Sequence, residues 1–291
     1  MKDLGHLSYF LGLEITHSTD GFYINQAKYA SELLSWVGLT DSKTIDTPVE
    51  LNAHLTPTGG KPLSNPSLYR RLVGSLVYLI VTRPDISYVV HQVSQYLSAP
   101  WSTHYVAVLR ILQYLKGTLF HGIFYSAQSP LVLRAFSDAD WAGDPIDRRF
   151  TTGYCFPLGS SLISWRSKKQ TFVAHSSIEA EYHAIADTTS ELLWLRWFLK
   201  DLGVSTYSVT PLYCDNQSAI HIAHNDVFYE QTKHIEIDCH FIRYHLVHGA
   251  LKLFSISFKD QLADIFTKSF PKCRTRDLVD NLKLVSHQPW V

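Results

Sequence analysis

Four acidic residues, spread over residues 131–268, constrain this chain more than any other feature. Asp138 ends an alternating apolar run that is typical of a β-strand, and Asp215 ends a second, shorter one. Glu181 lies in the first turns of a long helical pattern, and Asp264 lies at the start of another. A strand, a helix, a strand and a helix that each carry one carboxylate can bring four distant acids to one point. We therefore predict that these residues form a single site.

Carboxylates gathered in this way favour a metal site over a packed core. Clustered carboxylates repel one another strongly unless cations neutralise them. Mg²⁺ prefers oxygen ligands and keeps several of its waters, so a few Asp and Glu side chains can hold it. Two such ions about 4 Å apart can stabilise the attacking and leaving oxygens of an in-line displacement at phosphate. One such acid alone is more often a strand-end or helix-cap residue, and it is the set of four in this order that predicts the metal site.

The sequence around these acids resembles the ribonuclease H domain of copia-type LTR retrotransposon polyproteins. The resemblance is carried by five segments: Ser137–Asp144, Ser176–Tyr182, Cys214–Ala219, Thr232–Arg243 and Asp260–Lys268. In that family an Asp, Glu, Asp, Asp set binds two Mg²⁺ ions and cleaves the RNA strand of an RNA–DNA hybrid. The resemblance implies that the catalytic residues and metal ligands here are Asp138, Glu181, Asp215 and Asp264. It also implies that Mn²⁺ can substitute for Mg²⁺.

Three of these assignments choose between neighbouring acids. They are Asp138 over Asp140, Glu181 over Glu179, and Asp264 over Asp260. Each chosen residue stands where relatives place the acid of the patterns Thr-Asp-Gly-Ser, Glu-Leu-x-Ala and Asp-Glu-Leu. The choice of Glu181 is the one that the sequence leaves most open.

The N-terminal part of the chain has a different character. Residues 7–25 predict a β-hairpin, because two strand-like runs flank a turn that contains Asp20–Gly21. A helix is predicted over 26–37, and three further helical patterns follow at 68–82, 85–97 and 102–115. By resemblance, residues 1–125 are the C-terminal remnant of a reverse transcriptase, mostly helical, with a primer-grip-like hairpin followed by thumb and connection helices.

A change from helical to strand-like period near 121–130 predicts a domain boundary. We expect a ribonuclease H domain over 131–270, an α/β (α+β) fold with a mixed five-stranded sheet, and a C-terminal tail over 271–291. In the expected ribonuclease H domain, a three-stranded meander leads directly into the helix that carries Glu181. This order disfavours the related integrase and transposase cores, which place their essential Glu on a late helix.

The balance of charge gives no indication of nucleic-acid binding, since Lys+Arg and Asp+Glu number 26 each. Any such surface must therefore be local. Arg166, Lys168 and Lys169 form a basic cluster just before the helix of Glu181, and they are candidates for contact with the backbone of a hybrid. The alternative, that they form a solvated turn, stays open.

The predicted function is Mg²⁺-dependent endonucleolytic hydrolysis of the RNA strand of RNA–DNA hybrids during reverse transcription of a retrotransposon. The expected partner is the hybrid, without a membrane or a small-molecule cofactor. We expect no polymerase activity, because the Tyr-Val-Asp-Asp box of the family is absent from this chain, a truncated polyprotein. The alternative is an inactive retrotransposon-derived fragment that at most binds nucleic acid.

An intracellular location is expected, because the four cysteines show no paired spacing and are most simply reduced thiols. By resemblance the location is a cytoplasmic virus-like particle or the nucleus. No apolar run is as long as a membrane-spanning helix, which needs about 18 residues. The polar start at residues 1–5 does not resemble a signal peptide.

Overall fold

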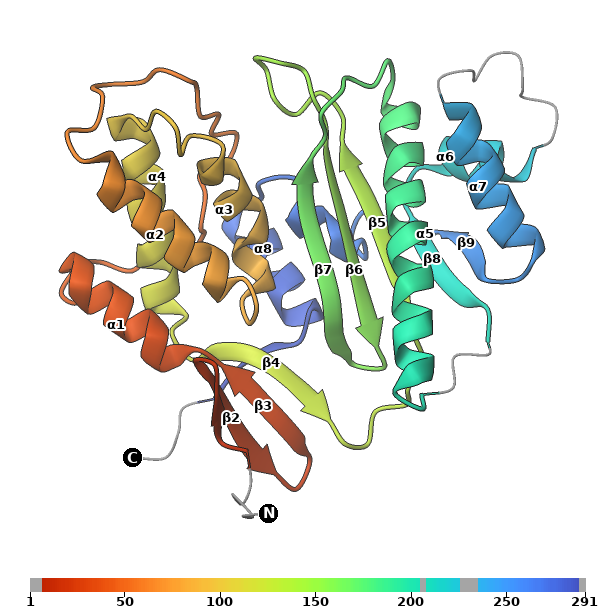
Figure 1. Ribbon diagram of the computed structural model, residues 1–291, viewed down its shortest axis with the longest axis horizontal. Helices are drawn as coiled ribbons and strands as arrows, with labels where there is room; N and C mark the ends of the chain where they lie inside the picture. Colours follow the sequence, from red (N-terminus) through yellow and green to blue (C-terminus); the bar gives the residue numbers. More distant parts are fainter. Residues whose placement is uncertain (1–6, 205–207, 226–234, 288–291) are drawn as a thin grey trace. The chain divides into compact units, whose positions relative to one another are not determined.

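A computed structural model describes three stretches of the chain, namely residues 7–204, 208–225 and 235–287. The chain forms two compact units, each with its own sheet (Figure 1). Unit 1 comprises residues 1–129 together with 269–291, and unit 2 comprises residues 130–268. Along the chain, unit 2 is therefore inserted between two parts of unit 1. The segment that we predicted as a separate C-terminal tail is grouped with unit 1.

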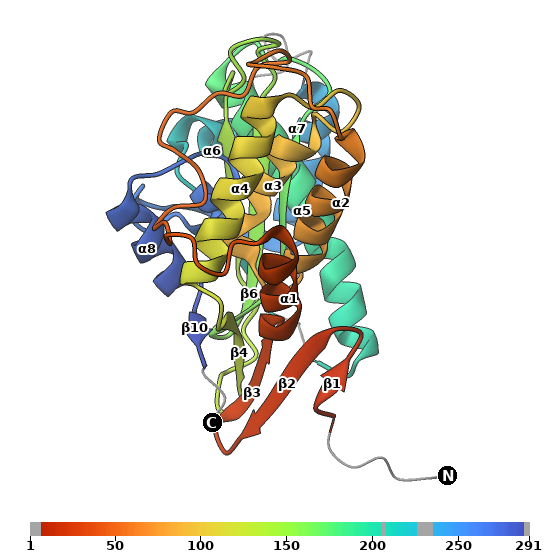
Figure 2. The same ribbon diagram turned by 90° about the vertical axis from the view of Figure 1, so that its left-hand side faces the viewer.

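The sheet of unit 1 has five antiparallel strands in the order β1-β2-β3-β4-β10. They are β1 (Tyr9–Phe10), β2 (Leu13–Ser18), β3 (Gly21–Asn25), β4 (His121–Ser126) and β10 (Leu284–Ser286). β2 and β3 form the predicted hairpin, and Figure 2 shows them beside β1. The remaining two strands extend this hairpin into a sheet. β4 lies in the segment 121–130, where we predicted a domain boundary, and β10 lies in the predicted tail.

Five α-helices accompany this sheet in the described part of unit 1. They are α1 (Ala27–Val37), α2 (Pro66–Leu79), α3 (Ser87–Ser94), α4 (Ser102–Gly117) and α8 (Lys272–Asn281), with a short 3-10 helix η1 (Pro84–Ile86) before α3. α1 ends where Gly38 adopts a left-handed conformation with φ of 71°. α2 begins at Asn65, whose side chain accepts a hydrogen bond from the Leu68 amide. The apolar faces of α1 to α4 form one buried core, as the helical periods of the sequence predict.

A buried ion pair lies in unit 1 where η1 meets the end of α4. The guanidinium of Arg83 donates to both carboxylate oxygens of Asp85, at 2.7 and 3.0 Å, and also to the carbonyl and hydroxyl oxygens of Thr118. The hydroxyl of Tyr114 donates to Asp85 at 2.7 Å. Burial alone raises the pKa of Asp85, but the adjacent Arg83 charge and these hydrogen bonds outweigh it and lower that pKa. The pair therefore stays ionised although both side chains are almost fully buried.

Unit 2 has a mixed five-stranded sheet in the order β7-β6-β5-β8-β9. Its strands are β5 (Ala135–Asp140), β6 (Thr151–Leu158), β7 (Ser161–Lys169), β8 (Thr210–Cys214) and β9 (Leu251–Ser255). β5, β6 and β7 form an antiparallel meander, whereas β8 and β9 run parallel to β5. This mixed sheet and its meander are the ribonuclease H-like fold that the sequence predicts, and the expected fold class is confirmed.

The helices of unit 2 are α5 (Ser177–Asp201), α6 (Gln217–His224), α7 (Glu236–Val247) and the 3-10 helix η4 (Leu262–Phe266). α5 packs along β5 and β6 (Figure 1), where the Thr188 hydroxyl donates to that of Ser137. η4 packs against the same two strands, beside the side chain of Asp138. Because successive side chains of a strand point to opposite faces, α5 and η4 cover opposite faces of the sheet. Among the described residues, no helix is long and apolar enough to cross a membrane.

Candidate metal centre

The parallel pairing of β5 and β8 places Asp138 beside Asp215. Ala135 pairs with Leu212 and Phe136 with Tyr213, so the same offset puts residue 138 level with residue 215 where the two strands end. Ligand sites in sheets of this kind form at the carboxyl ends of adjacent parallel strands. Asp138 is buried, with 1% of its surface exposed, and Asp215 lies half-buried just after β8. The pairing of these two strands therefore determines the positions of two of the four predicted carboxylates.

The start of α5 decides which of two glutamates points into the site. The hydroxyl of Ser176 accepts a hydrogen bond from the Glu179 amide at 3.2 Å, and the Glu179 carboxylate accepts one from the His175 amide at 2.6 Å. Glu179 therefore takes part in capping the helix. Glu181 lies two residues further on, about 200° around the helix. Its side chain is buried and accepts a hydrogen bond from the Ala139 amide at 3.3 Å.

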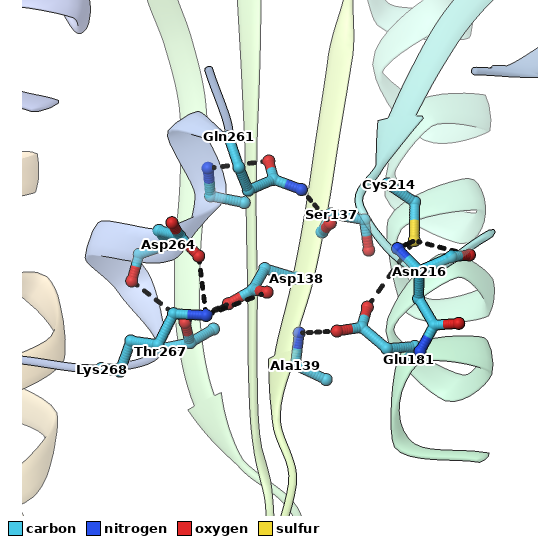
Figure 3. Close-up of polar contacts among 11 residues, drawn as sticks. Ser137, Asp138, Ala139, Glu181, Cys214, Asn216, Gln261, Asp264, Thr267 and Lys268 are labelled. Carbon is cyan, nitrogen blue, oxygen red and sulfur yellow. Dashed lines mark hydrogen bonds and ion pairs between the residues drawn. The ribbon is translucent and has the colours of Figure 1, made fainter. Parts of the chain in front are cut away.

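Gln261 fixes the position of η4, the element that carries Asp264. Its side-chain oxygen caps η4 by accepting a hydrogen bond from the Ala263 amide at 3.2 Å. Its side-chain nitrogen donates to the Ser137 carbonyl oxygen of β5 at 2.9 Å. Gln261 and Asp264 are both fully buried. One side chain thus ties the start of η4 to the strand of Asp138, and Figure 3 shows these groups beside one another.

The four predicted ligands gather in two overlapping groups. Carboxylate oxygens of Asp138, Asp215 and Asp264 all lie within 4.8 Å of one another. Glu181 and Asp215 form the second group, within the same distance, together with the thiol of Cys214. Asp215 belongs to both groups and connects them. A donor set of carboxylate oxygens suits Mg²⁺ or Mn²⁺, which take oxygen ligands, and these four residues would hold such ions.

Burial and mutual repulsion oppose the ionised forms of two of these acids. Burial raises the pKa of Glu181, and the neighbouring charges of Asp138 and Asp215 raise it further. Burial also raises the pKa of Asp215, with a further contribution from Asp138. Carboxylates that carry such a penalty gain from any cation bound among them, which fits a metal centre better than a solvated acidic surface.

Thr267 and Lys268 contact the acids from the end of η4 (Figure 3). The Lys268 ammonium lies 2.7 Å from Asp264 Oδ1 and 3.4 Å from Asp138 Oδ2. The Thr267 hydroxyl donates a short hydrogen bond to Asp138. Burial alone lowers the pKa of Lys268, but the carboxylates of Asp138 and Asp264 outweigh it and raise that pKa. The ammonium therefore stays protonated inside the acidic group.

A glycine of β6 allows η4 to approach the sheet. Gly153 pairs with Asp138 across the antiparallel ladder. A Cβ atom at this position would lie 2.7 Å from Thr267 Cγ2, 2.8 Å from Phe266 Cβ and 3.1 Å from the Ala263 carbonyl oxygen. The first two distances are shorter than real Cβ contacts and the third is tighter than most, so glycine allows the 3-10 helix to lie this close.

Replacing Gly153 with Ala is therefore expected to displace η4. Overpacking of this kind lowers the free energy of unfolding by about 1–3 kcal/mol, and the displacement of Asp264 should weaken the binding of a metal ion. Chemical unfolding and a metal-binding titration would measure both effects. The control is Gly74→Ala on α2, where an added methyl group meets nothing within 4 Å. Equal behaviour of the two variants would contradict this account.

The three predicted basic contacts lie on β7 rather than in a turn before α5, because β7 continues to Lys169. The Lys169 ammonium lies 2.5 Å from Asp144 and 2.9 Å from Asp147. Lys168 is 3.9 Å from Asp187, and Arg166 is exposed. Residues 166 and 168 share one face of the strand and residue 169 the other, so the three do not form one cluster.

Several residues of the site receive no individual role in the sequence analysis. They are Gly153, Cys214, Gln261, Thr267 and Lys268. A glycine within a strand pattern is a general sign of close approach by another part of the backbone, and this sign was available at residue 153. The other four make contacts with residues that are distant in sequence, in addition to local ones. Of the segment 232–243 that contributed to the resemblance, residues 232–234 lie outside the described residues.

The chain is similar to retrotransposon polyproteins over nearly all of its length. It is 41% identical over 289 residues to the Pol polyprotein of transposon RE2 from Arabidopsis thaliana, a match that covers 99% of this chain and 20% of that protein. It is 37% identical over 281 residues to the Pol polyprotein of transposon TNT 1-94 from Nicotiana tabacum, covering 94% and 21%. The chain thus spans about a fifth of the length of these curated relatives.

A shorter relative is covered more completely. An uncharacterized mitochondrial protein of Arabidopsis thaliana is 44% identical over 194 residues, which are 67% of this chain and 80% of that protein. Among solved structures, a foamy viral protease-reverse transcriptase in complex with double-stranded DNA matches 85% of this chain and 37% of its own, with 11% identity and a TM-score of 0.45. The strand order, not this distant likeness, identifies the fold of unit 2.

No protein-family model matches the chain. The family is shown instead by the identities of 41% and 37% to the two Pol polyproteins, over 99% and 94% of this chain. The chain belongs to the copia-type retrotransposon Pol polyproteins.

Proposed function

We propose that unit 2 hydrolyses the RNA strand of RNA–DNA hybrids in a reaction that depends on Mg²⁺, as part of retrotransposon reverse transcription. The observation that carries this proposal is the meeting of Asp138, Asp215 and Asp264 within 4.8 Å, with Glu181 beside Asp215, in a ribonuclease H-like sheet. The family supports it, because Pol polyproteins of retrotransposons process nucleic acids. Without the metal ligands of a polymerase, the chain is not expected to synthesise DNA.

Each of the four acids has a distinct place in this proposal. Asp138 and Asp215 approach from two strand ends, Asp264 from η4, and Glu181 from the first turns of α5. Two bound Mg²⁺ ions would activate a water and stabilise the charge that develops on the phosphate oxygens. The chain itself holds the ligands in place. Rigid strands and caps fix their backbones, and their burial keeps the number of competing waters low.

A second part of the proposal concerns the path of the hybrid. Arg166 and Lys168 lie on the same face of β7, and they are the better candidates for contact with a phosphate backbone. Lys169 is already neutralised by Asp144 and Asp147, so it contributes little net positive charge. Recognition through backbone contacts would make binding weaken with rising salt.

The test is cleavage of an RNA–DNA hybrid that carries a different label on each strand. With Mg²⁺ or Mn²⁺ we expect the RNA strand alone to be cut, at internal positions, and we expect no cutting in EDTA. Single-stranded RNA and double-stranded DNA of the same sequence are the matched substrates, and both should remain intact. A folded protein that binds the hybrid without cutting it would support the other function, that of an inactive fragment that at most binds nucleic acid.

A further inference from the structure

An ammonium group lies between two of the four acids, Asp138 and Asp264. Lys268 Nζ lies 2.7 Å from Asp264 Oδ1, and its distances to the two carboxylate oxygens of Asp138 are 3.4 and 3.5 Å. The side chain is less than one-third exposed. Its Nζ also lies 5.7 Å from the centre of the Phe258 ring, a cation–π distance. The ammonium is therefore held from several sides.

The oxygens that hold this ammonium are the ones that a divalent cation would need. Asp138 and Asp264 both belong to the group of three carboxylates within 4.8 Å. A cation placed among these oxygens would lie within a few ångströms of the Lys268 charge. Two like charges at such a distance repel one another, and water screens this repulsion less inside a protein than at its surface. Metal binding must therefore either overcome this repulsion or break the contacts of Lys268 with Asp138 and Asp264.

We propose that Lys268 acts as an internal counter-cation that competes with divalent metal for Asp138 and Asp264. This inference rests on the proposed metal site and adds a control of its affinity. In the metal-free protein the ammonium offsets the repulsion among the buried acids and keeps the site formed. When metal binds, the ammonium is displaced toward solvent, where it can meet a phosphate of the bound nucleic acid. Lys268 thereby lowers the affinity of the site for metal and keeps the site folded when no metal is bound.

Thr267 limits how this exchange can occur. Its hydroxyl donates to Asp138 Oδ2, the oxygen that is also nearer to Lys268. Thr267 is fully buried, and its hydroxyl oxygen also lies 3.0 Å from the Asp264 carbonyl oxygen, a second acceptor for the same proton. Thr267 can therefore keep the Asp138 carboxylate oriented while the longer lysine side chain leaves. Thr267 thus orients the Asp138 carboxylate, and Lys268 neutralises its charge.

The experiment is calorimetric titration of Mg²⁺ into the full chain without nucleic acid. Lys268→Met removes the charge and keeps much of the side-chain volume, and we expect its dissociation constant for Mg²⁺ to be about fivefold lower than that of the parent chain. Lys268→Arg keeps the charge and should stay within about twofold of the parent. Lys200→Met removes a positive charge from an exposed position on α5, and it controls for the change in net charge.

Thermal unfolding in EDTA and in Mg²⁺ gives a second measurement. Lys268→Met should unfold at a lower temperature than the parent chain in EDTA and should gain more from added Mg²⁺, because binding stabilises by mass action. If Lys268→Met does not fold in EDTA, Lys268→Gln, which retains hydrogen-bond donors, replaces it. Unchanged or weaker Mg²⁺ binding by a folded charge-removing variant overturns the inference.

These outcomes separate the inference from the proposed function. Tighter Mg²⁺ binding by Lys268→Met supports the counter-cation even if the parent chain fails to cut a hybrid. If the parent chain cleaves a hybrid but binds Mg²⁺ with the same affinity as Lys268→Met, the proposed nuclease function is supported and the counter-cation role of Lys268 is refuted. A parent chain that binds no Mg²⁺ at all, together with a variant that also binds none, overturns both.

Discussion

Replacing Asp138 with Asn is expected to lower the rate of hybrid cleavage about a thousandfold, the effect of removing one essential electrostatic group from an active site. The substitution keeps the shape of the side chain and removes one anionic ligand from the group of three carboxylates. The fold should survive, because the lost ion pair with Lys268 and the relieved repulsion with the other acids act in opposite directions. We therefore expect the unfolding temperature in EDTA to change by no more than about 3 °C.

The matched control for this variant is Asp260→Asn. Asp260 is exposed and accepts a hydrogen bond from the Ser257 hydroxyl at 2.6 Å, and it is the neighbour that the sequence offers as an alternative to Asp264. Its replacement should leave cleavage nearly unchanged. Single-turnover rates on one labelled hybrid would compare the two variants. Full activity of Asp138→Asn would refute the proposed ligand set. Loss of activity in Asp260→Asn alone would indicate that Asp260, and not Asp264, is the fourth ligand.

Replacing Asp85 with Ala is expected to destabilise unit 1 by about 3–5 kcal/mol, the usual cost of leaving one member of a buried ion pair without its partner. The guanidinium of Arg83 would remain almost fully buried without its carboxylate partner, and the Tyr114 hydroxyl would lose its acceptor. Hydrogen exchange of amides in α2 and α4 reports on unit 1 and separates this loss from events in unit 2.

The exposed pair between Arg110 and Glu50 provides the control. Its two charges lie 2.8 Å apart, but 69% of the Glu50 side chain is exposed. Glu50→Ala should therefore cost less than about 1 kcal/mol. If both variants cost the same, burial of the Arg83–Asp85 pair is not what makes it important.

The same ion pair predicts how the stability of unit 1 depends on pH. The pKa of Asp85 is lowered in the folded protein, so its contribution is fully present above the unfolded pKa of about 3.9. It is lost as the pH falls through the folded pKa. The difference in unfolding free energy between the parent chain and Asp85→Ala should be constant from about pH 5 to 8 and should shrink below about pH 4. A difference that stays constant down to pH 2 would contradict the linkage.

Much of the fold can be predicted from sequence because its signals are local. The alternation of Leu131–Asp138 and the helical period before Gly38 each define an element without knowledge of the rest of the chain. The parallel pairing of β5 with β8 then follows from their place in the sheet and brings Asp138 to Asp215. These steps need only periodicity, end signals and the resemblance of five short segments.

The missed features depend on contacts between distant parts of the chain. Leu284–Ser286 is a strand only because it pairs with β4, and three residues carry no period of their own. His121–Ser126 has a strand-like period that we interpreted as a domain boundary, and its place in the sheet of unit 1 appears only once its partners β3 and β10 are known. Lys268 resembles any surface lysine, since its role comes from Asp138, 130 positions earlier. Its function is a property of the folded chain rather than of the motif.

The return of the chain into unit 1 after Lys268 has a consequence for synthesis on the ribosome. β4 emerges early, but the strand that covers its free edge is not made until unit 2 has been translated. During that interval β4 presents unpaired backbone groups, which can pair with other chains. Nascent unit 1 is therefore most prone to aggregation while unit 2 is being made. Chains that stop at Lys268 would keep this vulnerability permanently, whereas chains that include Leu284–Ser286 can cover the edge of β4.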